Sequence, residues 1–393
     1  MLNTHLSPWP SFSEEEITAV SQVLQSNKVN YWTGQQGREF EKEFAEYTDC
    51  KYAVAVANGT LALDLALHAL NISQGDEVIV TSRTFIASIS SIINAGATPI
   101  FADVELDSQN ISAATINPVI TDKTKAIICV HLAGWPCEMD DIMALATRHN
   151  LYVIEDCAQA HGTKYKGKSV GSIGHIGAWS FCQDKIMTTG GEGGMLTTND
   201  ENLWRKAWAF KDHGKSYAAV YEKQHPPGYR WLHESFGTNW RLTEMQSAIG
   251  RIQLKRMPTW TKLRNENAEK IFQVCRQYSW LIVPTVPNYI QHAYYKCYVF
   301  VDQSKLPAGV LRDDVLTAIN ALNVPCYSGS CSEVYKEKAF DNTELQPKVA
   351  LKQAKMLGET SLMFLVHPTI TNSEISNVCE SLTQALDIIN NKL

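Results

Sequence analysis

The sequence lacks any long apolar run and any strong excess of charge of one sign. Its net charge is only −6 over 393 residues, so it carries no electrostatic signature of a protein that binds nucleic acid or an anionic membrane. The N-terminal stretch has neither the basic nor the apolar segment of a secretory signal, and no segment reaches the length of a membrane-spanning helix. We therefore expect a cytoplasmic protein without nucleic-acid or membrane partners.

Closely spaced cysteines are missing as well. The ten cysteines are scattered, and none of them forms a C-x-x-C pair. The closest two, Cys326 and Cys331, have no histidine cluster beside them. This pattern argues against a disulfide framework and against a zinc site, and it indicates reduced thiols and no bound metal.

An alternation of strand-like and helix-like segments dominates the first half of the chain. Hydrophobic residues make up 45% of the sequence, which is typical of a globular protein with a large core. Because apolar strands alternate with helices, we expect an α/β fold with a mostly parallel sheet covered on both faces. The expected strands are residues 52–57, 77–81, 98–102, 125–132, 151–155, 176–181 and 195–198.

A single lysine, Lys185, stands between two of the expected core strands. The loop that follows it contains four glycines within residues 190–194, which would let the backbone pass close to a ligand. Removal from water would lower the pKa of such a lysine and make its amine a nucleophile able to form a Schiff base. An exposed lysine in a flexible hairpin is the alternative interpretation of this stretch.

Several candidate ligand-binding residues follow the expected strands. The turn Asn58-Gly59-Thr60 connects a strand to a helix, whose N-terminus offers free N–H groups to a phosphate, although many such turns bind nothing. Phe85, Asp156 and Gln159 also follow strands directly. Because parallel sheets bind ligands at the carboxyl ends of their strands, we expect these residues and Lys185 at one edge. A Schiff-base lysine, a carboxylate and a phosphate cradle are the groups that pyridoxal 5'-phosphate requires.

The whole chain resembles the DegT/DnrJ/EryC1/StrS family of sugar aminotransferases, which belongs to the fold-type I pyridoxal-phosphate enzymes. Several sequence motifs of the family occur together in this chain, and together they are far more specific than any one of them alone. The matching stretches are Trp32-Thr33-Gly34, Phe40-Glu41-Lys42-Glu43-Phe44-Ala45, Ala57-Asn58-Gly59-Thr60-Leu61-Ala62-Leu63, Thr84-Phe85-Ile86-Ala87-Ser88, His131-Leu132-Ala133-Gly134, Glu155-Asp156-Cys157-Ala158-Gln159-Ala160-His161-Gly162, residues 180–194, Asn239-Trp240-Arg241-Leu242-Thr243-Glu244-Met245-Gln246 and Val366-His367-Pro368-Thr369.

We expect two domains, because the composition changes after residue 256. Residues 1–256 would form the large cofactor-binding domain, with a mostly parallel seven-stranded sheet sandwiched by helices. Residues 257–393 would form a smaller C-terminal α+β domain, where the composition changes. Separate helices are expected at residues 242–256 and 260–278, on either side of the boundary.

The resemblance also implies roles for the matching residues. Lys185 would hold the cofactor as a Schiff base and move the substrate proton, and Asp156 would pair with the pyridine nitrogen. Phe85 would stack on the ring, and Gln159 would face the side of its phenolic oxygen. The alternative role for Phe85 is that of a core residue.

The resemblance also implies which residues would bind the phosphate of the cofactor. Gly59, Thr60 and Ser180 would bind it from one subunit. Asn239 would reach it from the other subunit, so the resemblance implies a homodimer with a shared active site. A loop cap is the alternative role for Asn239.

One departure concerns the residues before the lysine. Many family members have Phe-His-Pro-x-Lys, where this chain has Phe181-Cys182-Gln183-Asp184-Lys185. The glutamine resembles the aminocyclitol branch and some nucleotide-sugar members. The lysine argues against the dehydratase branch, which has a histidine at this place.

The expected activity is transfer of an amino group from an amino acid, L-glutamate, to a nucleotide-linked 4-keto-6-deoxyhexose. This would serve amino-sugar biosynthesis for a surface polysaccharide such as lipopolysaccharide O antigen, or for a glycosylated metabolite. A 3-keto acceptor, an aminocyclitol (keto-inositol) aminotransferase using glutamine and a non-catalytic regulatory paralogue are the alternatives. A nicotinamide-dependent oxidoreductase is disfavoured because no G-x-G-x-x-G motif follows the first strand.

Residues 211–230 are polar and contain Pro226-Pro227-Gly228, which indicates a surface insertion. Lys211, Lys215, Lys223 and Arg230 could meet the diphosphate of a nucleotide sugar. Solvated charges on a mobile loop are the favoured interpretation.

Overall fold

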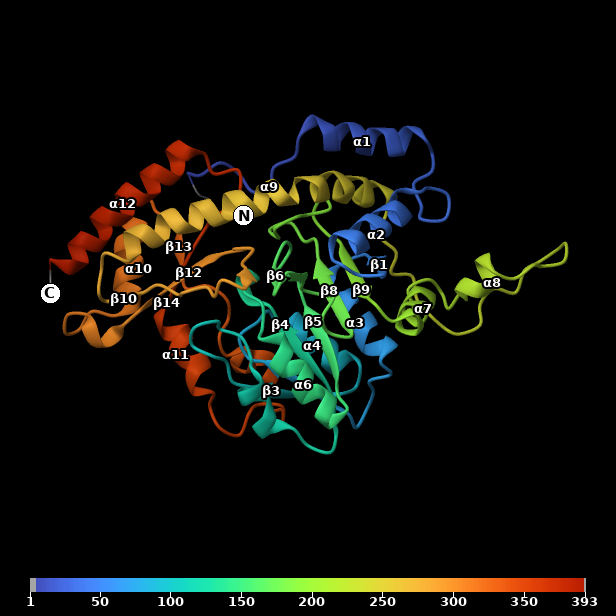
Figure 1. Cartoon of the computed structure of the whole chain (residues 1–393), viewed down its shortest axis with the longest axis horizontal. Coiled ribbons are helices and arrows are strands. Elements are labelled where there is room, and N and C mark those ends of the chain that lie inside the picture. The colour runs from blue at the N-terminus through green and yellow to red at the C-terminus, as the bar shows by residue number, and fades with distance from the viewer. Residues whose placement is uncertain (1–4, 392–393) are drawn as a thin grey trace.

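The computed structural model describes residues 5–391, and a seven-stranded sheet forms the centre of the chain (Figure 1). β9 runs antiparallel to both of its neighbours, and the other adjacent pairs are parallel. This sheet confirms the expected α/β fold with a mostly parallel seven-stranded sheet. The strands, in spatial order, are β1 (Tyr52–Val56), β9 (Gly194–Thr198), β8 (Ile176–Ser180), β5 (Tyr152–Asp156), β4 (Thr124–Val130), β2 (Glu77–Thr81) and β3 (Thr98–Ala102).

Both faces of the sheet are buried. Successive side chains along a strand point to opposite faces, and each face packs into its own apolar core. In β2, Val78 and Val80 pack on one face and Ile79 packs on the other. The first face is covered by α3 (Gly59–Ala69), α4 (Ala87–Asn94) and α7 (Glu201–Phe210). The second face is covered by α2 (Gln36–Tyr47), α6 (Met139–His149) and part of α9 (Glu244–Cys275).

The C-terminal part contains an antiparallel four-stranded sheet with its own apolar core. Its strands, in spatial order, are β10 (Leu281–Ile282), β12 (Cys297–Val301), β14 (Ser361–Phe364) and β13 (Cys326–Tyr327), and α10 (Arg312–Ala321) and α12 (Asn372–Asn390) pack on it. A small sheet joins the two parts, since β11 (Ile290–Gln291) pairs with β6 (Lys164–Tyr165), which pairs with β7 (Lys168–Ser169).

The other elements are short or peripheral. They are the α-helices α1 (Glu14–Gln25), α5 (Ala113–Ile116), α8 (Tyr217–Tyr221) and α11 (Lys352–Thr360), and the 3-10 turns η1 (Asn117–Val119), η2 (Leu132–Gly134), η3 (Gln303–Lys305), η4 (Val334–Lys336) and η5 (Lys338–Phe340). None of the helices within residues 5–391 combines the length and the apolar character that crossing a membrane requires.

Helix α9 differs from the expectation of two separate helices. It is one continuous helix of 32 residues with Pro258 inside it, and it crosses the upper part of Figure 1 beneath α1. Pro258 is exposed, so the missing N–H weakens the helix without disturbing a buried contact. The expected boundary between residues 256 and 257 falls inside this helix. The division into two domains at that point stays a prediction.

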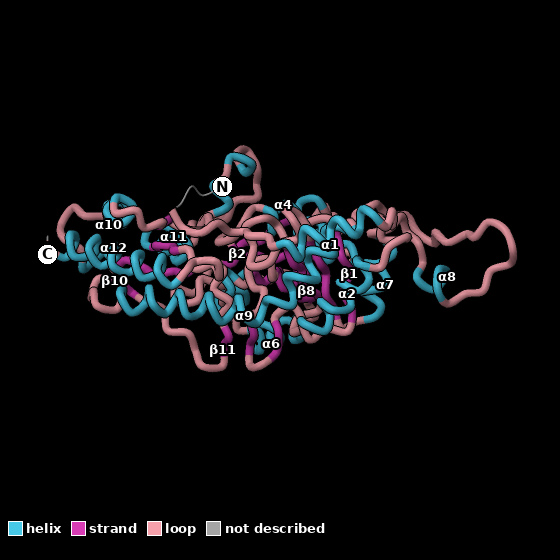
Figure 2. Tube along the Cα trace, turned by 90° about the horizontal axis from the view of Figure 1, so that it is seen from above, coloured by secondary structure: helices cyan, strands magenta, loops and turns pink. Residues whose placement is uncertain are grey.

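The segment between α7 and α9 carries α8 and projects from the body as an arm (residues 213–238), in agreement between the two views (Figures 1 and 2). Its base is firmly held, because Asp212 accepts hydrogen bonds from Trp32 Nε1 at 2.8 Å and from Arg241 Nη1 at 2.6 Å. Lys211 is fully buried at this base, with its ammonium 3.6 Å from the Tyr31 ring centroid. The interpretation of Lys211 as a solvated or diphosphate-binding residue is therefore wrong.

Candidate active site

The start of α3 forms an anion site. Asn58 caps the helix by accepting a hydrogen bond from Leu61 N–H at 2.9 Å, which leaves the N–H groups of Gly59 and Thr60 at the open first turn. Ser180 ends β8 and lies directly against this turn. A Cβ atom at Gly59 would come within 2.5 Å of Ser180 Cβ, so only glycine allows the approach. The structure thus brings three of the expected phosphate-binding residues together.

Asp156 ends β5 as a buried carboxylate. Its Oδ2 accepts a hydrogen bond from Ser88 Oγ at 2.8 Å, and its Oδ1 accepts one from Ala158 N–H at 3.1 Å. Burial raises the pKa of Asp156, although these hydrogen bonds and the nearby charge of Lys185 act in the opposite direction. A cationic partner such as a protonated ring nitrogen would stabilise the carboxylate further. Sequence reasoning gave no role to Ser88, although it lies in one of the matching stretches.

Gln159 lies beside a strained turn. Its side-chain oxygen accepts a hydrogen bond from Ala133 N–H at 2.8 Å, which orients the amide NH2 group as the available donor. Ala133 has a φ of 56°, in the left-handed region that non-glycine residues rarely adopt. Strain of this kind is typical of ligand-binding sites.

Two other candidates are open to solvent in the single chain. Phe85 follows β2 and is 68% exposed, which is unusual for a large apolar residue at the end of a core strand. Its uncovered ring is available for stacking, so the core-residue alternative is wrong. Asn239 is exposed at the base of the arm, where its backbone pairs with Asp212.

Lys185 is half-buried and held from two directions. Its ammonium lies 5.1 Å from the centroid of the Tyr295 ring. Its backbone carbonyl accepts a hydrogen bond from the indole N–H of Trp9 at 2.9 Å. The lysine therefore does not lie in a loose hairpin. Burial raises the pKa of Asp156, and the charge of Lys185 offsets part of this rise.

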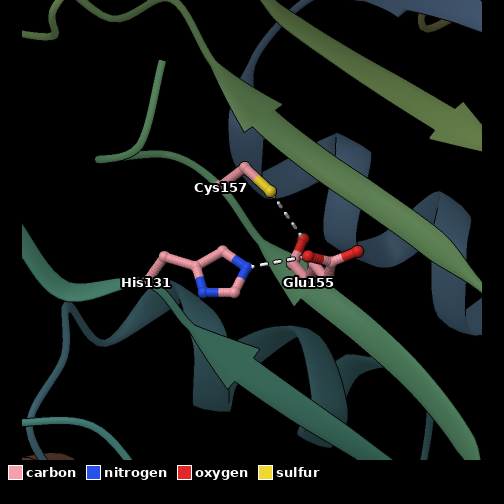
Figure 3. Close-up of side chains that lie close together, drawn as sticks. All are labelled: His131, Glu155 and Cys157. Carbon is pink, nitrogen blue, oxygen red and sulfur yellow. Dashed lines mark hydrogen bonds and ion pairs between the residues drawn. The ribbon is translucent and has the colours of Figure 1, made fainter. Parts of the chain in front are cut away.

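A buried polar cluster supports the end of β5 (Figure 3). His131 Nδ1 accepts a hydrogen bond from Cys137 N–H at 3.1 Å, which leaves Nε2 to donate to Glu155 at 2.9 Å. The other oxygen of Glu155 accepts hydrogen bonds from two backbone N–H groups, and the thiol of Cys157 donates to the Glu155 carbonyl. These three side chains have metal-binding chemistry, but their ligand atoms are engaged in hydrogen bonds. We assign them a structural role.

The groups present fit pyridoxal phosphate. The turn at Gly59 leaves backbone donors for a phosphate, the exposed ring of Phe85 offers a stacking face, and the buried Asp156 favours a cationic partner. When bound, this cofactor supplies an electron sink that stabilises negative charge on the substrate carbon. The residues of the chain bind and orient it, and Lys185 offers an amine that can carry a proton.

The comparisons with known proteins decide the family. The sequence profile of the DegT/DnrJ/EryC1/StrS aminotransferase family matches residues 10–383. The chain belongs to this family. It is a pyridoxal-phosphate-dependent aminotransferase with the fold-type I architecture, as expected from the sequence.

Several known proteins resemble the chain over nearly its whole length. The X-ray structure of the aminotransferase from Psychrobacter cryohalolentis is 65% identical, has a TM-score of 0.97 and is matched over 98% of this chain and 100% of that chain. The spore coat polysaccharide biosynthesis protein SpsC of Bacillus subtilis is 36% identical over 96% of each chain. GDP-perosamine synthase of Caulobacter vibrioides is 36% identical over 94% of this chain and 98% of its own.

Proposed function

We propose that this aminotransferase moves the amino group of L-glutamate to a nucleotide-linked keto sugar, with a 4-keto-6-deoxyhexose as the acceptor. The observation that carries the proposal is the grouping of the half-buried Lys185, the buried Asp156 and the open helix start at Gly59. The similarity to GDP-perosamine synthase supports a nucleotide-linked sugar, and that to SpsC supports a product used for a surface polysaccharide. Lipopolysaccharide O antigen is the polysaccharide that we expect.

Each residue has a proposed task. Lys185 would hold the cofactor and move the proton between the substrate carbon and the cofactor carbon. Asp156 keeps the ring nitrogen protonated, and Ser88 fixes this carboxylate by its hydrogen bond. Phe85 stacks on the ring, and the NH2 group of Gln159 faces the phenolic oxygen.

The phosphate site needs a second copy of the chain in this proposal. Gly59, Thr60 and Ser180 bind the phosphate from one side, and Asn239 of the other subunit completes the site. The projecting arm supports this arrangement, because Trp231 is 83% exposed and Phe236 is 99% exposed in the single chain. Exposed aromatic side chains of this size are typical of interaction surfaces. We therefore propose a homodimer in which the arm lies on the partner.

The visible absorption spectrum of the pyridoxal-phosphate-loaded protein tests the proposal. L-Glutamate should bleach the yellow band, and a subsequent keto-sugar nucleotide should restore it, since the two half-reactions are separate. Borohydride should attach the cofactor irreversibly to Lys185, as peptide mass spectrometry can show, and Lys185→Ala should lose this product. Attachment to a different lysine would refute the assignment of Lys185.

The same measurement separates the acceptor and donor classes. Bleaching by glutamine but not by glutamate would point to an aminocyclitol acceptor, in line with Gln183 before the lysine. Nuclear magnetic resonance of the aminated product distinguishes a 4-keto from a 3-keto sugar. Bleaching by glutamate without recovery on any nucleotide-linked keto sugar would refute the proposed acceptor.

A further inference from the structure

The segment before α1 reaches the candidate lysine from far away in the sequence. The indole N–H of Trp9 donates a hydrogen bond to the backbone carbonyl of Lys185 at 2.9 Å, although 176 positions separate the two residues. The amide N–H of Lys185 donates to the Cys182 carbonyl at 3.1 Å. Both backbone polar groups of the lysine are thus satisfied, and one of them depends on a side chain outside the sheet.

The position of the Trp9 ring is fixed by α9 and the C-terminal part. The Arg264 guanidinium lies over the ring at 5.0 Å from its centroid, and the His367 ring is stacked on it at 6.1 Å between centroids. The neighbouring Pro8 carbonyl accepts a hydrogen bond from Thr369 Oγ1 at 2.9 Å. These contacts hold the indole in one orientation, as a directional hydrogen bond to Lys185 requires.

The side chain of the lysine is held by a second aromatic residue, Tyr295. Its ring centroid lies 5.1 Å from Lys185 Nζ, and its hydroxyl donates a hydrogen bond to Asp184. Arg264 Nη1 approaches the Tyr295 carbonyl at 3.5 Å. Arg264 therefore contacts both aromatic residues, and it links the support of the lysine backbone to that of the lysine side chain.

We propose that Trp9 is a positioning residue for Lys185. By its hydrogen bond it fixes the backbone from which the lysine side chain extends past Tyr295 towards the cofactor site. This inference rests on the proposed role of Lys185. A lysine side chain has several rotatable bonds, so a fixed starting point reduces the number of positions that its amine can take. Small displacements of a reacting group lower rates strongly, even when the displaced contact is remote from the chemistry.

The substitution Trp9→Phe tests the inference because it keeps an aromatic ring and removes the N–H donor. We expect the yellow band to form about tenfold more slowly after pyridoxal phosphate is added to the cofactor-free variant. We also expect kcat to fall about tenfold with KM for the amino donor changed less than twofold, because Trp9 acts on the lysine rather than on substrate binding.

The matched control is Trp260→Phe. Trp260 meets Trp9 edge-on at 5.1 Å between ring centroids. Among residues 5–391, the indole that donates a hydrogen bond to Lys185 is that of Trp9 and not that of Trp260. A phenylalanine keeps the aromatic edge, so this variant should form the band within about twofold of the wild-type rate. Equal slowing in both variants would mean that Trp9 only fills space, and a wild-type rate in Trp9→Phe would also overturn the inference.

Two further measurements separate the possible failures. If Trp9→Phe does not fold, Trp9→benzothienylalanine keeps the shape of the indole and lacks only its N–H, and it must show the same slowing. Borohydride attachment of the cofactor to Lys185 in wild type, lost in Lys185→Ala, establishes the role on which the inference rests. Attachment to another lysine refutes that role, whereas attachment to Lys185 with no effect of Trp9 refutes only the positioning.

Discussion

Asp156 is a buried acid whose hydrogen bonds and electrostatic environment only partly offset the cost of its burial. Ser88 and Ala158 donate to it, yet burial still raises the pKa of its carboxyl group. A protonated ring nitrogen would meet the carboxylate directly and provide a cationic partner at the end of β5. At the scale of the residue, the acid is thus suited to a charged ligand rather than to the stability of the protein alone.

The substitution Asp156→Asn should lower kcat of the amino-donor half-reaction by about 10²- to 10³-fold. The amide keeps the shape of the side chain but loses the negative charge that stabilises the protonated ring. The rate of bleaching by L-glutamate measures the effect. Asp64→Asn is a control, because burial also raises the pKa of Asp64 but its side chain lies beside Ser91 of α4, a residue without a proposed role in the site. A rate for Asp156→Asn that matches this control would contradict the assignment.

The raised pKa of Asp156 also predicts a pH dependence of stability in the cofactor-free protein. The folded state holds the carboxyl proton more tightly than the unfolded chain does, so stability falls as pH rises from the ordinary aspartate value of 3.8 towards the raised pKa. Asparagine has no carboxyl group to titrate, so the free energy of unfolding of Asp156→Asn should not include this decrease with pH. Urea unfolding of both proteins between pH 4 and pH 7, roughly the range set by ordinary and raised carboxyl pKa values, measures the difference. A constant difference would contradict the argument.

At the scale of the element, α9 shows a balance between local preference and packing. A proline inside a helix removes one N–H donor and favours an end or a kink. In α9 the helix continues, because buried residues on both sides of Pro258, such as Leu254 and Ala268, belong to different cores that hold its two halves. The packing of the two cores therefore outweighs the local cost of the proline.

The substitution Pro258→Ala should raise the free energy of unfolding by about 1–3 kcal/mol, because alanine restores an N–H donor and a favourable helix residue. Pro258 is exposed, so the change leaves no cavity. Thermal and urea unfolding measure the gain. Thr259→Ala is the control, since Thr259 is the exposed neighbour that already has its N–H. Destabilisation by Pro258→Ala would indicate that the helix needs the proline geometry.

At the scale of the whole molecule, the arm leaves large aromatic side chains uncovered in the single chain. Its base is held by Asp212 and buried Lys211, whereas Trp231 and Phe236 along the arm are exposed. A firmly held base with exposed aromatic side chains beside it is suited to contact with a second copy. The proposed homodimer would cover these side chains, and it would bring Asn239 to the phosphate of the partner.

The double substitution Trp231→Ser/Phe236→Ser should weaken the proposed dimer about 10- to 100-fold, because buried aromatic side chains dominate most interfaces. Sedimentation velocity over a range of protein concentrations measures the dissociation constant. The double substitution Lys338→Ser/Val349→Ser changes two exposed residues outside the arm and should leave the dimer unchanged. A monomeric wild-type protein, or a dimer insensitive to the arm substitutions, would contradict the proposal.

Much of the fold followed from local patterns. The apolar strands and their alternation with helices indicated the mostly parallel sheet, because a strand buried on both faces needs a continuous apolar run. The continuity of α9 did not follow, because the proline signal is local and the two cores that overrule it are formed by distant segments. Lys211 was misinterpreted for the same reason, since a lysine in a polar stretch gives no sign that Tyr31 covers it.

The sequence by itself determined the family, the type of fold and the candidate residues. Short local motifs carry the family and the residues, and the alternation of apolar strands with helices carries the fold. Only the tertiary structure decided which groups support those residues. Ser88 donates to Asp156, and Trp9 donates to the Lys185 carbonyl across 176 positions. Such contacts depend on how separate elements pack in space, and the spacing of residues along one chain does not contain that information.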